Sequence, residues 1–295
     1  MLARIAPALF VLLWSTGFIA SKLGAPHAEP FTFLSVRFLL VIAIMVPICL
    51  VARAPWPTGS AFRHSVVVGA LMHGVYLSGV FWAIRRGMPA GVVALLVSLQ
   101  PVLTAVLAWT LLGERITLRH WGGLALGLAG AVLVIWPKLE AEVASEGSGI
   151  NVATATAATL ALLGMTLGTI YQKSSAAHPD LRTGSVVQFL GAIAVAGPLA
   201  LLLETREIVW SGPFLVALAW LVIPMSIVSI NLLMILIRQN AVSRLSALFY
   251  LVPAVTAVLA YLMFGETLAP MQLVGVALVM AAVVLIKPVA FRAKE

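Results

Sequence analysis

Apolar residues run along the chain in long blocks that are separated by short polar segments. A helix needs roughly 20 apolar residues to cross the core of a bilayer. Ten blocks meet this length, at about residues 5–24, 32–52, 65–84, 90–112, 119–136, 152–172, 183–203, 212–237, 241–264 and 268–287. The pattern therefore predicts an all-α membrane protein with ten transmembrane helices.

The first block also has features of a secretory signal peptide, since Arg4 precedes an apolar stretch from Pro7 to Trp14. The apolar stretch continues to Ala20, however, and the block has a counterpart later in the chain. We therefore expect it to be retained as the first membrane helix.

Composition supports a membrane protein and argues against nucleic-acid binding as the explanation of the positive net charge. Hydrophobic residues make up 62% of the chain and charged residues 9%, against about 45–50% and 25% in soluble domains. The net charge is +8, but the basic residues are scattered between apolar blocks and do not form the stripe that nucleic-acid binding requires. Cys49 is the single cysteine, which excludes an intramolecular disulfide and a site built from two thiolates.

The distribution of basic residues predicts the orientation in the membrane. With ten spans both termini lie on one side, and that side carries Arg4, Arg53, Arg63, Arg115, Arg119, Lys173, Arg182, Arg238, Arg244, Lys287, Arg292 and Lys294. The opposite side carries Lys22, Arg85, Arg86, Lys138 and Arg206, and Arg37 falls inside a span. Because loops rich in Lys and Arg stay in the cytoplasm, both termini are predicted to be cytoplasmic.

The two halves of the chain repeat each other. Pro101-Val-Leu-Thr-Ala-Val-Leu-Ala108 recurs as Pro253-Ala-Val-Thr-Ala-Val-Leu-Ala260, and Gly113-Glu114 recurs as Gly265-Glu266, both 152 residues on. Arg37-Phe38 matches Gln188-Phe189 at a spacing of 151. Because each half has five helices, the second copy must cross the membrane in the opposite direction, as in many secondary transporters. We expect a first repeat at 1–137, a polar external linker at 138–150 and an inverted second repeat at 151–295.

These features resemble the EamA-type family of the drug/metabolite transporter superfamily. The resemblance covers essentially the whole chain and rests on Trp14-Ser15 with Lys22-Leu-Gly24, on Arg37-Phe38-Leu39, and on the repeated Pro…Gly-Glu pattern. It implies a multi-pass protein of the bacterial inner membrane that exports small metabolites, commonly amino acids, through a central cavity. Small multidrug pumps of the superfamily use a Glu in the first helix, which is absent here, so their proton-coupled mechanism does not carry over.

Ionisable residues inside spans are the first candidates for a site, because they are costly in a membrane and mark function by default. His73 lies near the middle of its span and Tyr76 follows three residues later, which predicts one helix face. His73 either makes an interhelical hydrogen bond or contacts the substrate, with protonation as a third role. Arg37 either extends its charged end to the membrane surface or binds a substrate carboxylate. Glu114 and Glu266, at helix ends, are interpreted mainly as fixing those ends.

A second set of candidates surrounds two prolines inside spans. Pro101 and Pro253 each remove a backbone hydrogen bond and predict kinks that serve gating. Polar and aromatic residues near them, or in the first helix, predict a substrate-binding site of the broken-helix type; they are Trp14, Ser15, Gln100, Ser246, Phe249 and Tyr250. The alternative is that these residues only pack helix against helix.

The sequence therefore predicts a secondary transporter or facilitator, with small molecules and the lipid bilayer as its partners. No phosphate-binding loop, zinc-binding helix or nucleophile elbow appears, so we expect no enzyme activity, no cofactor, no metal and no nucleic acid. The alternatives are a proton-coupled drug/metabolite antiporter and, from another class, a membrane-embedded enzyme or sensor. The oligomeric state stays open, and a monomer is compatible with the sequence.

Overall fold

The computed structural model describes residues 2–143, 149–175, 179–240, 242–264 and 269–286, and all of its regular elements within these ranges are helical. The first half contains α1 (Leu2–Gly24), η1 (Ala25–His27), α2 (Pro30–Val51), α3 (Gly59–Gly69), η2 (Ala70–Val75), α4 (Tyr76–Arg85), α5 (Ala90–Val97), α6 (Gln100–Leu112) and α7 (Leu118–Val143). The second half contains α8 (Val152–Ser174), α9 (Leu181–Leu203), α10 (Gly212–Trp220), η3 (Leu221–Ser229), α11 (Ile230–Gln239), α12 (Val242–Ser246), η4 (Ala247–Tyr250), α13 (Leu251–Phe264) and α14 (Pro270–Ile286).

The predicted membrane helices are present in the structure. Nine stretches of the described residues are helical, long and apolar enough to span a bilayer, and the tenth, α14, is a shorter apolar helix of 17 residues. Several spans join more than one element, such as α3, η2 and α4 across Gly59–Arg85. The all-helical membrane fold predicted from hydropathy is therefore confirmed.

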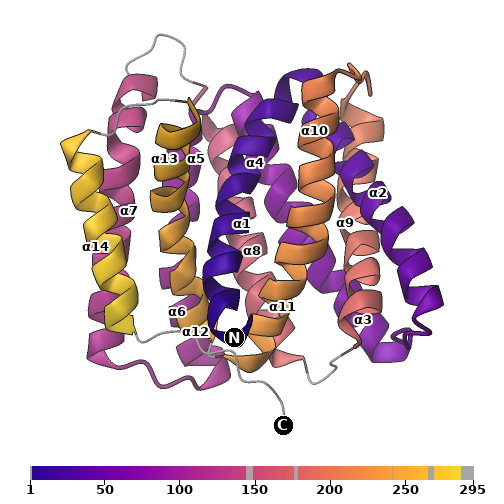
Figure 1. Ribbon diagram of the computed structural model, residues 1–295, viewed down its shortest axis with the longest axis horizontal. Coiled ribbons are helices and arrows are strands. Elements are labelled where there is room, and N and C mark those ends of the chain that lie inside the picture. Colours follow the sequence, from indigo (N-terminus) through magenta and orange to yellow (C-terminus); the bar gives the residue numbers. More distant parts are fainter. Residues whose placement is uncertain (1, 144–148, 176–178, 241, 265–268, 287–295) are drawn as a thin grey trace.

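Contacts between loops show which helix ends share a face of the bundle. On one face, which we call the linker face, Ala28 pairs with Ile208 in an isolated bridge and Gly149 N donates to Gly87 O. On the other, the terminal face, the Glu114 carboxylate accepts from Val242 N. Figure 1 shows α1 beginning and α14 ending at this terminal face. Residues 144–148 of the predicted linker, and Gly265 and Glu266, lie outside the described residues.

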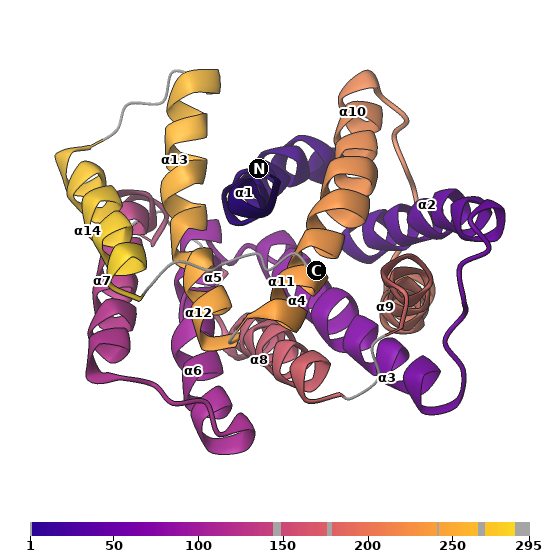
Figure 2. The same ribbon diagram turned by 60° about the horizontal axis from the view of Figure 1, so that its bottom comes forward.

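The halves are related as inverted copies. α1 rises from the terminal face, whereas α8, which opens the second half, runs toward it (Figure 1). α7 and α14 pack closely at one end of an elongated bundle, and α2, α3 and α9 lie at the other (Figures 1 and 2). A Cβ placed on Gly130 would lie 2.8 Å from Gly275 O, and one on Gly123 would lie 3.2 Å from Ala282 O. Gly123 and Gly275 occupy one repeat position, and Gly130 and Ala282 occupy another, both 152 residues apart. The repeat therefore converts one contact into the other, as a pseudo-twofold axis requires.

The helices that cross the centre are interrupted at repeat-related positions. η2 is a π-helical segment in the third span, and η3, which starts 151 residues after it, is a π-helical segment in the eighth. α5 ends at Val97 and α6 starts at Gln100, with Pro101 in its first turn. The matching part of the ninth span is the 3₁₀ segment η4, followed by α13 with Pro253 near its start. Irregular helix of this kind is common at functional sites.

Carboxylates hold α2 and α9 together at the linker face. Glu204, which follows α9, accepts hydrogen bonds from Phe31 N at 2.8 Å, from Thr32 N at 2.6 Å and from the Thr32 hydroxyl at 2.7 Å. Glu29, which precedes α2, accepts from Thr205 N and the Thr205 hydroxyl in return. The first turn of α2 thus obtains the hydrogen-bond acceptors that a helix start lacks.

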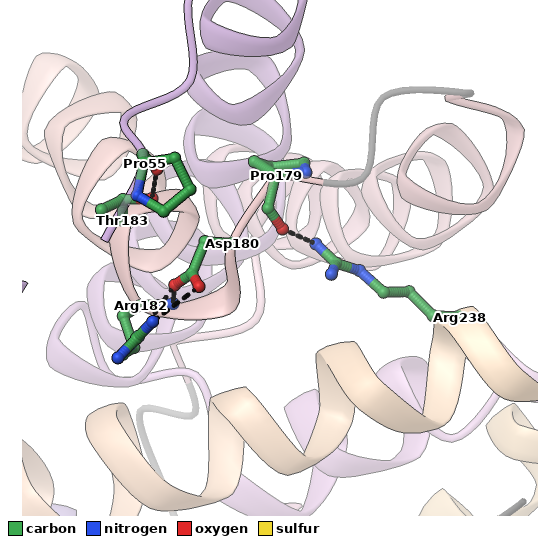
Figure 3. Close-up of polar contacts among 6 residues, drawn as sticks. All are labelled: Pro55, Pro179, Asp180, Arg182, Thr183 and Arg238. Carbon is green, nitrogen blue, oxygen red and sulfur yellow. Dashed lines mark hydrogen bonds and ion pairs between the residues drawn. The ribbon is translucent and has the colours of Figure 1, made fainter. Parts of the chain in front are cut away.

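The terminal end of α9 has its own contacts, shown in Figure 3. Asp180 caps the helix and accepts from Arg182 Nε at 3.0 Å and Nη2 at 2.9 Å. The Thr183 hydroxyl donates to Pro55 O at 2.7 Å, and Arg238 donates to Pro179 O at 2.8 Å. Glu29 and Asp180 precede α2 and α9 at the same repeat position, so a carboxylate stands before each helix of the pair.

Acid should destabilise the protein through these two carboxylates. The hydrogen bond from the Thr205 hydroxyl lowers the pKa of Glu29 below its usual 4.5, and the hydrogen bond from Arg182 lowers the pKa of Asp180 below its usual 3.8. A lowered folded-state pKa gives stability that is complete above the usual pKa and is lost as the pH falls through the lowered value. We expect unfolding in detergent to become easier below about pH 4.5. Asp180→Asn combined with Glu29→Gln should flatten that slope, and an unchanged slope would contradict the assignment.

Candidate functional site

An aromatic cluster lies between α1 and the ninth span. The ring centroids of Phe10, Trp14 and Phe249 are 5.2–5.5 Å apart, and the Phe249 ring meets each of the other two edge to face. Such geometry suits the quadrupoles of aromatic rings. Trp14 and Phe249, both predicted as site residues, are thus in direct contact, and Phe10 completes the cluster although sequence reasoning missed it.

Ser15 connects α1 to α13 in this structure. Its hydroxyl donates to Val11 O at 2.8 Å and to Val252 O at 3.3 Å, and the Thr256 hydroxyl donates to Ser15 O at 3.4 Å. A polar residue that satisfies main-chain carbonyls across a helix interface stabilises packing in a membrane. In this conformation Ser15 therefore acts as a helix contact beside Pro253.

The remaining residues of the second set lie in other surroundings. Gln100 donates to the Thr104 hydroxyl at 3.0 Å, and Ser246 donates to Ser243 O at 3.1 Å. Tyr250 is buried against α7, where a Cβ on Gly127 would lie 2.5 Å from its ring, and its hydroxyl has no partner among the described residues. Although Phe249 and Tyr250 are neighbours, they belong to different apolar clusters, so the predicted set does not form one surface here.

A buried polar cluster lies between α2, η2, α9 and η3; we define it as Arg37, His73, Gln188 and Ser226. Arg37 is 3% exposed and its Nε donates to the Ser226 hydroxyl at 2.9 Å. The His73 ring stacks on Phe189 with centroids 5.3 Å apart and planes 17° apart. The Gln188 side chain and the Arg37 charge are both near enough to the His73 ring to act on it. Arg37 thus points into the protein and does not extend to the membrane surface.

Tyr76 is buried, but it does not follow His73 along a regular α-helix. His73 lies in the π-helical segment η2, and Tyr76 is the first residue of α4. The i, i+3 argument assumes 3.6 residues per turn and does not describe a π-helical segment with its wider i→i+5 hydrogen bonds. Periodicity alone therefore cannot say which face the two side chains share.

Two members of the polar cluster escaped the sequence analysis as site residues, namely Gln188 and Ser226. A signal for Gln188 was present, because it occupies the repeat position of Arg37. Ser226 lies 151 residues after Val75, the last residue of η2, so the repeat comparison pairs it with an apolar residue and does not mark it.

Glu114 fixes a helix end, as interpreted from the sequence. Its carboxylate accepts from Val242 N at 2.7 Å, Ser243 N at 3.2 Å and the Ser243 hydroxyl at 2.6 Å, so it caps α12. At the end of α11, the helix before α12, Lys173 donates to Ile237 O at 2.9 Å and to Arg238 O at 3.2 Å. The junction between the eighth and ninth spans is therefore held by one charge at each of its helix ends.

A pocket of about 280 Å³ opens at the linker face, above the start of α2. Its lining includes Glu29, Phe31, Trp82, Arg86 and Glu204, and the Arg86 guanidinium lies over the Trp82 ring at 5.3 Å. Within the described ranges no group of three or more His, Cys, Asp or Glu side chains is placed to hold a metal ion. Among the described residues, the buried interior of the bundle offers aromatic rings, the Arg37 guanidinium and neutral polar groups.

Comparison with known proteins agrees with this architecture. The EamA-like transporter family matches residues 2–136 and again residues 153–287. The chain belongs to the EamA-like transporter family. This EamA-like transporter is a multi-pass inner-membrane protein whose partners are a small-molecule substrate and the lipid bilayer.

Individual relatives of this EamA-like transporter are distant but match over most of their length. A probable amino-acid metabolite efflux pump of Salmonella typhimurium is 28% identical over 92% of this chain and 90% of that protein. The inner membrane transporter YedA of Escherichia coli is 24% identical over 95% and 89%. A WAT1-related chloroplastic protein of Arabidopsis thaliana is 27% identical, and the match covers 66% of its length. One crystal structure aligns with a TM-score of 0.78 over 99% of both chains at 21% identity, which shows the fold.

Proposed function

We propose that this EamA-like transporter exports small amphipathic metabolites, amino acids first among them, by alternating access. The observation that carries the proposal is the pair of repeat-related interruptions in the fourth and ninth spans, with the Phe10–Trp14–Phe249 cluster beside one of them. Inverted repeats with broken helices at midplane are how secondary transporters build a substrate site. The Salmonella relative named as an efflux pump supports the direction and the substrate class.

The roles proposed for single residues follow from their places. Trp14 and Phe249 supply an aromatic wall, and Pro101 and Pro253 lie where the spans flex. Substrate contacts are proposed for Ser15, His73, Tyr76, Gln100, Ser246 and Tyr250, with Arg37 as the contact to a carboxylate. Ser15 must exchange its hydrogen bond to Val252 O before it can bind a substrate. We place the terminal face in the cytoplasm on the bias of Lys and Arg.

We further propose that transport is uncoupled and follows the substrate gradient. The described part of the first span holds no acidic side chain. The buried His73, whose Nε2 has no partner among the described residues, favours the second candidate, a proton-coupled antiporter. Counterflow of labelled amino acids in proteoliposomes, with and without an imposed pH gradient, separates the two. Saturable flux that ignores the gradient supports the facilitator, flux that follows it supports coupling, and no flux of any amino acid refutes the proposed substrate class.

Replacing Trp14 with Ala should reduce amino-acid flux about tenfold, since the loss of an aromatic contact to a substrate corresponds to ~1.4 kcal/mol. Flux is measured in proteoliposomes at equal amounts of reconstituted protein. Trp14→Phe keeps the aromatic packing and should retain most of the flux. Trp109→Ala is the matched control, because Trp109 is 59% exposed on the outside of the bundle. Normal flux in a folded Trp14→Ala protein would remove Trp14 from the site.

A further inference from the structure

The polar cluster leaves the charge of Arg37 unbalanced. Arg37 is 3% exposed, and the hydrogen bond of its Nε goes to a neutral hydroxyl. Among the described residues the ion pair is Arg182 with Asp180 at the terminal face, and none includes Arg37. A buried cation without an anion is strongly destabilising in a membrane protein. The site therefore favours an anionic group beside the guanidinium.

Two other polar atoms of the cluster lack partners among the described residues. They are His73 Nε2 and Gln188 Oε1, on side chains that are 2% and 4% exposed. The Gln188 amide nitrogen is directed at Gln172 Oε1, at 3.3 Å, so the oxygen is the end of the amide that is left to accept from His73 or from a ligand that separates the two. A neutral imidazole with its proton on Nε2 is a donor. The cluster thus offers the Arg37 guanidinium and the His73 N–H to an anion, and the Gln188 oxygen to a cation.

The repeat explains why a side chain that suits an anion and a side chain that suits a cation lie so close together. Arg37 and Gln188 occupy the same position in the two halves, as do Phe38 and Phe189, whose ring centroids are 5.6 Å apart. α2 and α9 therefore meet at the pseudo-twofold axis with one repeat position from each half. Because one copy is Arg and the other Gln, a symmetric fold presents unlike groups to whatever binds between them.

We propose that the polar cluster binds the zwitterionic head of an α-amino acid, with the carboxylate on Arg37 and His73 and the ammonium on Gln188 Oε1. The proposal rests on the proposed function and assigns recognition of the two charges of its substrate to particular residues. An α-amino acid carries both charges on one carbon, so the two ends stay within the reach of one cluster. A chloride ion would balance Arg37 and accept from His73, but it would leave Gln188 Oε1 without a partner. The π-helical segments η2 and η3, which carry His73 and Ser226, give the cluster a wall that can move.

Ligand-induced thermal stabilisation of the purified protein tests the site without any need for transport. The probes are leucine, its deaminated analogue 4-methylpentanoate, its decarboxylated analogue 3-methylbutylamine, and sodium chloride, each added in chloride-free buffer. Leucine should raise Tm more than either analogue and more than chloride. In Arg37→Gln the apparent affinity for leucine and 4-methylpentanoate should fall about tenfold or more, since a charge-assisted hydrogen bond is lost. The response to 3-methylbutylamine should stay.

Gln188→Leu should show the converse, losing the response to 3-methylbutylamine and keeping that to 4-methylpentanoate. Arg119→Gln is the matched control, because Arg119 is exposed at the start of α7 and should respond as the wild type does. An Arg37→Gln protein with a lower Tm but unchanged responses would give Arg37 a structural role and overturn the proposal. Equal stabilisation by chloride and leucine, or none by any probe, would overturn it as well.

Failure of the site and failure of the proposed function give different results. Leucine-specific stabilisation that Arg37→Gln abolishes, in a protein without flux, would keep the site and refute transport. Amino-acid flux that Arg37→Gln leaves intact would keep transport and refute the site.

Discussion

Gly191→Ala is expected to cost about 3 kcal/mol or more and to lower Tm in detergent by roughly 5–10 °C. A Cβ on Gly191 would lie 2.1 Å from Val66 O, and one on Gly69 would lie 1.8 Å from Gln188 O. Both obstacles are main-chain atoms, which cannot move aside like the end of a flexible side chain. α3 and α9 would have to separate at the crossing that positions Gln188.

A glycine on the same helix provides the control. The nearest atom to a Cβ on Gly197 is a side-chain methyl of Ile193 at 3.5 Å, an ordinary contact. Gly197→Ala should therefore be neutral or add about 0.5–1 kcal/mol, because alanine favours helix over glycine. Thermal unfolding of the two variants in the same detergent measures the difference. Equal Tm values would contradict the close crossing of α3 and α9.

Glu204→Ala is expected to destabilise the protein by about 2 kcal/mol, because hydrogen bonds to a charged group are the stronger kind. The substitution leaves the main-chain N–H groups of Phe31 and Thr32 without an acceptor at the start of α2. Glu204→Gln keeps one carbonyl acceptor and should lose less. Unfolding in detergent at neutral pH is the measurement.

Glu207 is the matched control for Glu204, since it is an exposed carboxylate three residues further on with no hydrogen bond among those found in the described structure. Glu207→Ala should leave stability unchanged within about 0.5 kcal/mol. If both variants behave alike, the loss reflects charge at the linker face in general and not the capping of α2.

Hydropathy and internal repetition predicted most of the fold, because both act over many residues. Most helix ends lie within a few residues of the predicted places, but α7 continues to Val143, beyond the predicted end at 136 and into the predicted linker. Glu114 caps a helix as interpreted, although its partners Val242 and Ser243 are far away in the sequence. The repeat also paired Arg37-Phe38 with Gln188-Phe189, although only the structure shows that the halves meet there. These features depend on the order of residues along the chain and not on how each helix is turned.

The direction in which individual side chains point was harder to predict. Several spans are apolar on all sides, so they carry no polar stripe that would indicate the inward face. Phe249 faces the Trp14 cluster whereas Tyr250 packs on α7, within a 3₁₀ segment that the sequence did not predict. The π-helical segments η2 and η3 also escaped prediction, because no residue pattern in the sequence was read as marking them. The predicted site residues were therefore found in several places rather than around one surface.

The matched π-helical segments η2 and η3 would allow the third and eighth spans to rewind. A residue contributes about 100° of rotation in an α-helix, and the wide turn of a π-helix holds a surplus residue. If η2 relaxed to regular winding, α4 would turn about its own axis relative to α3 without either end of the span unravelling. The same change in η3 would turn α11 relative to α10. Each half thus contains one π-helical segment whose rewinding would rotate the helix after it, so that the side chains of that helix would face a second direction.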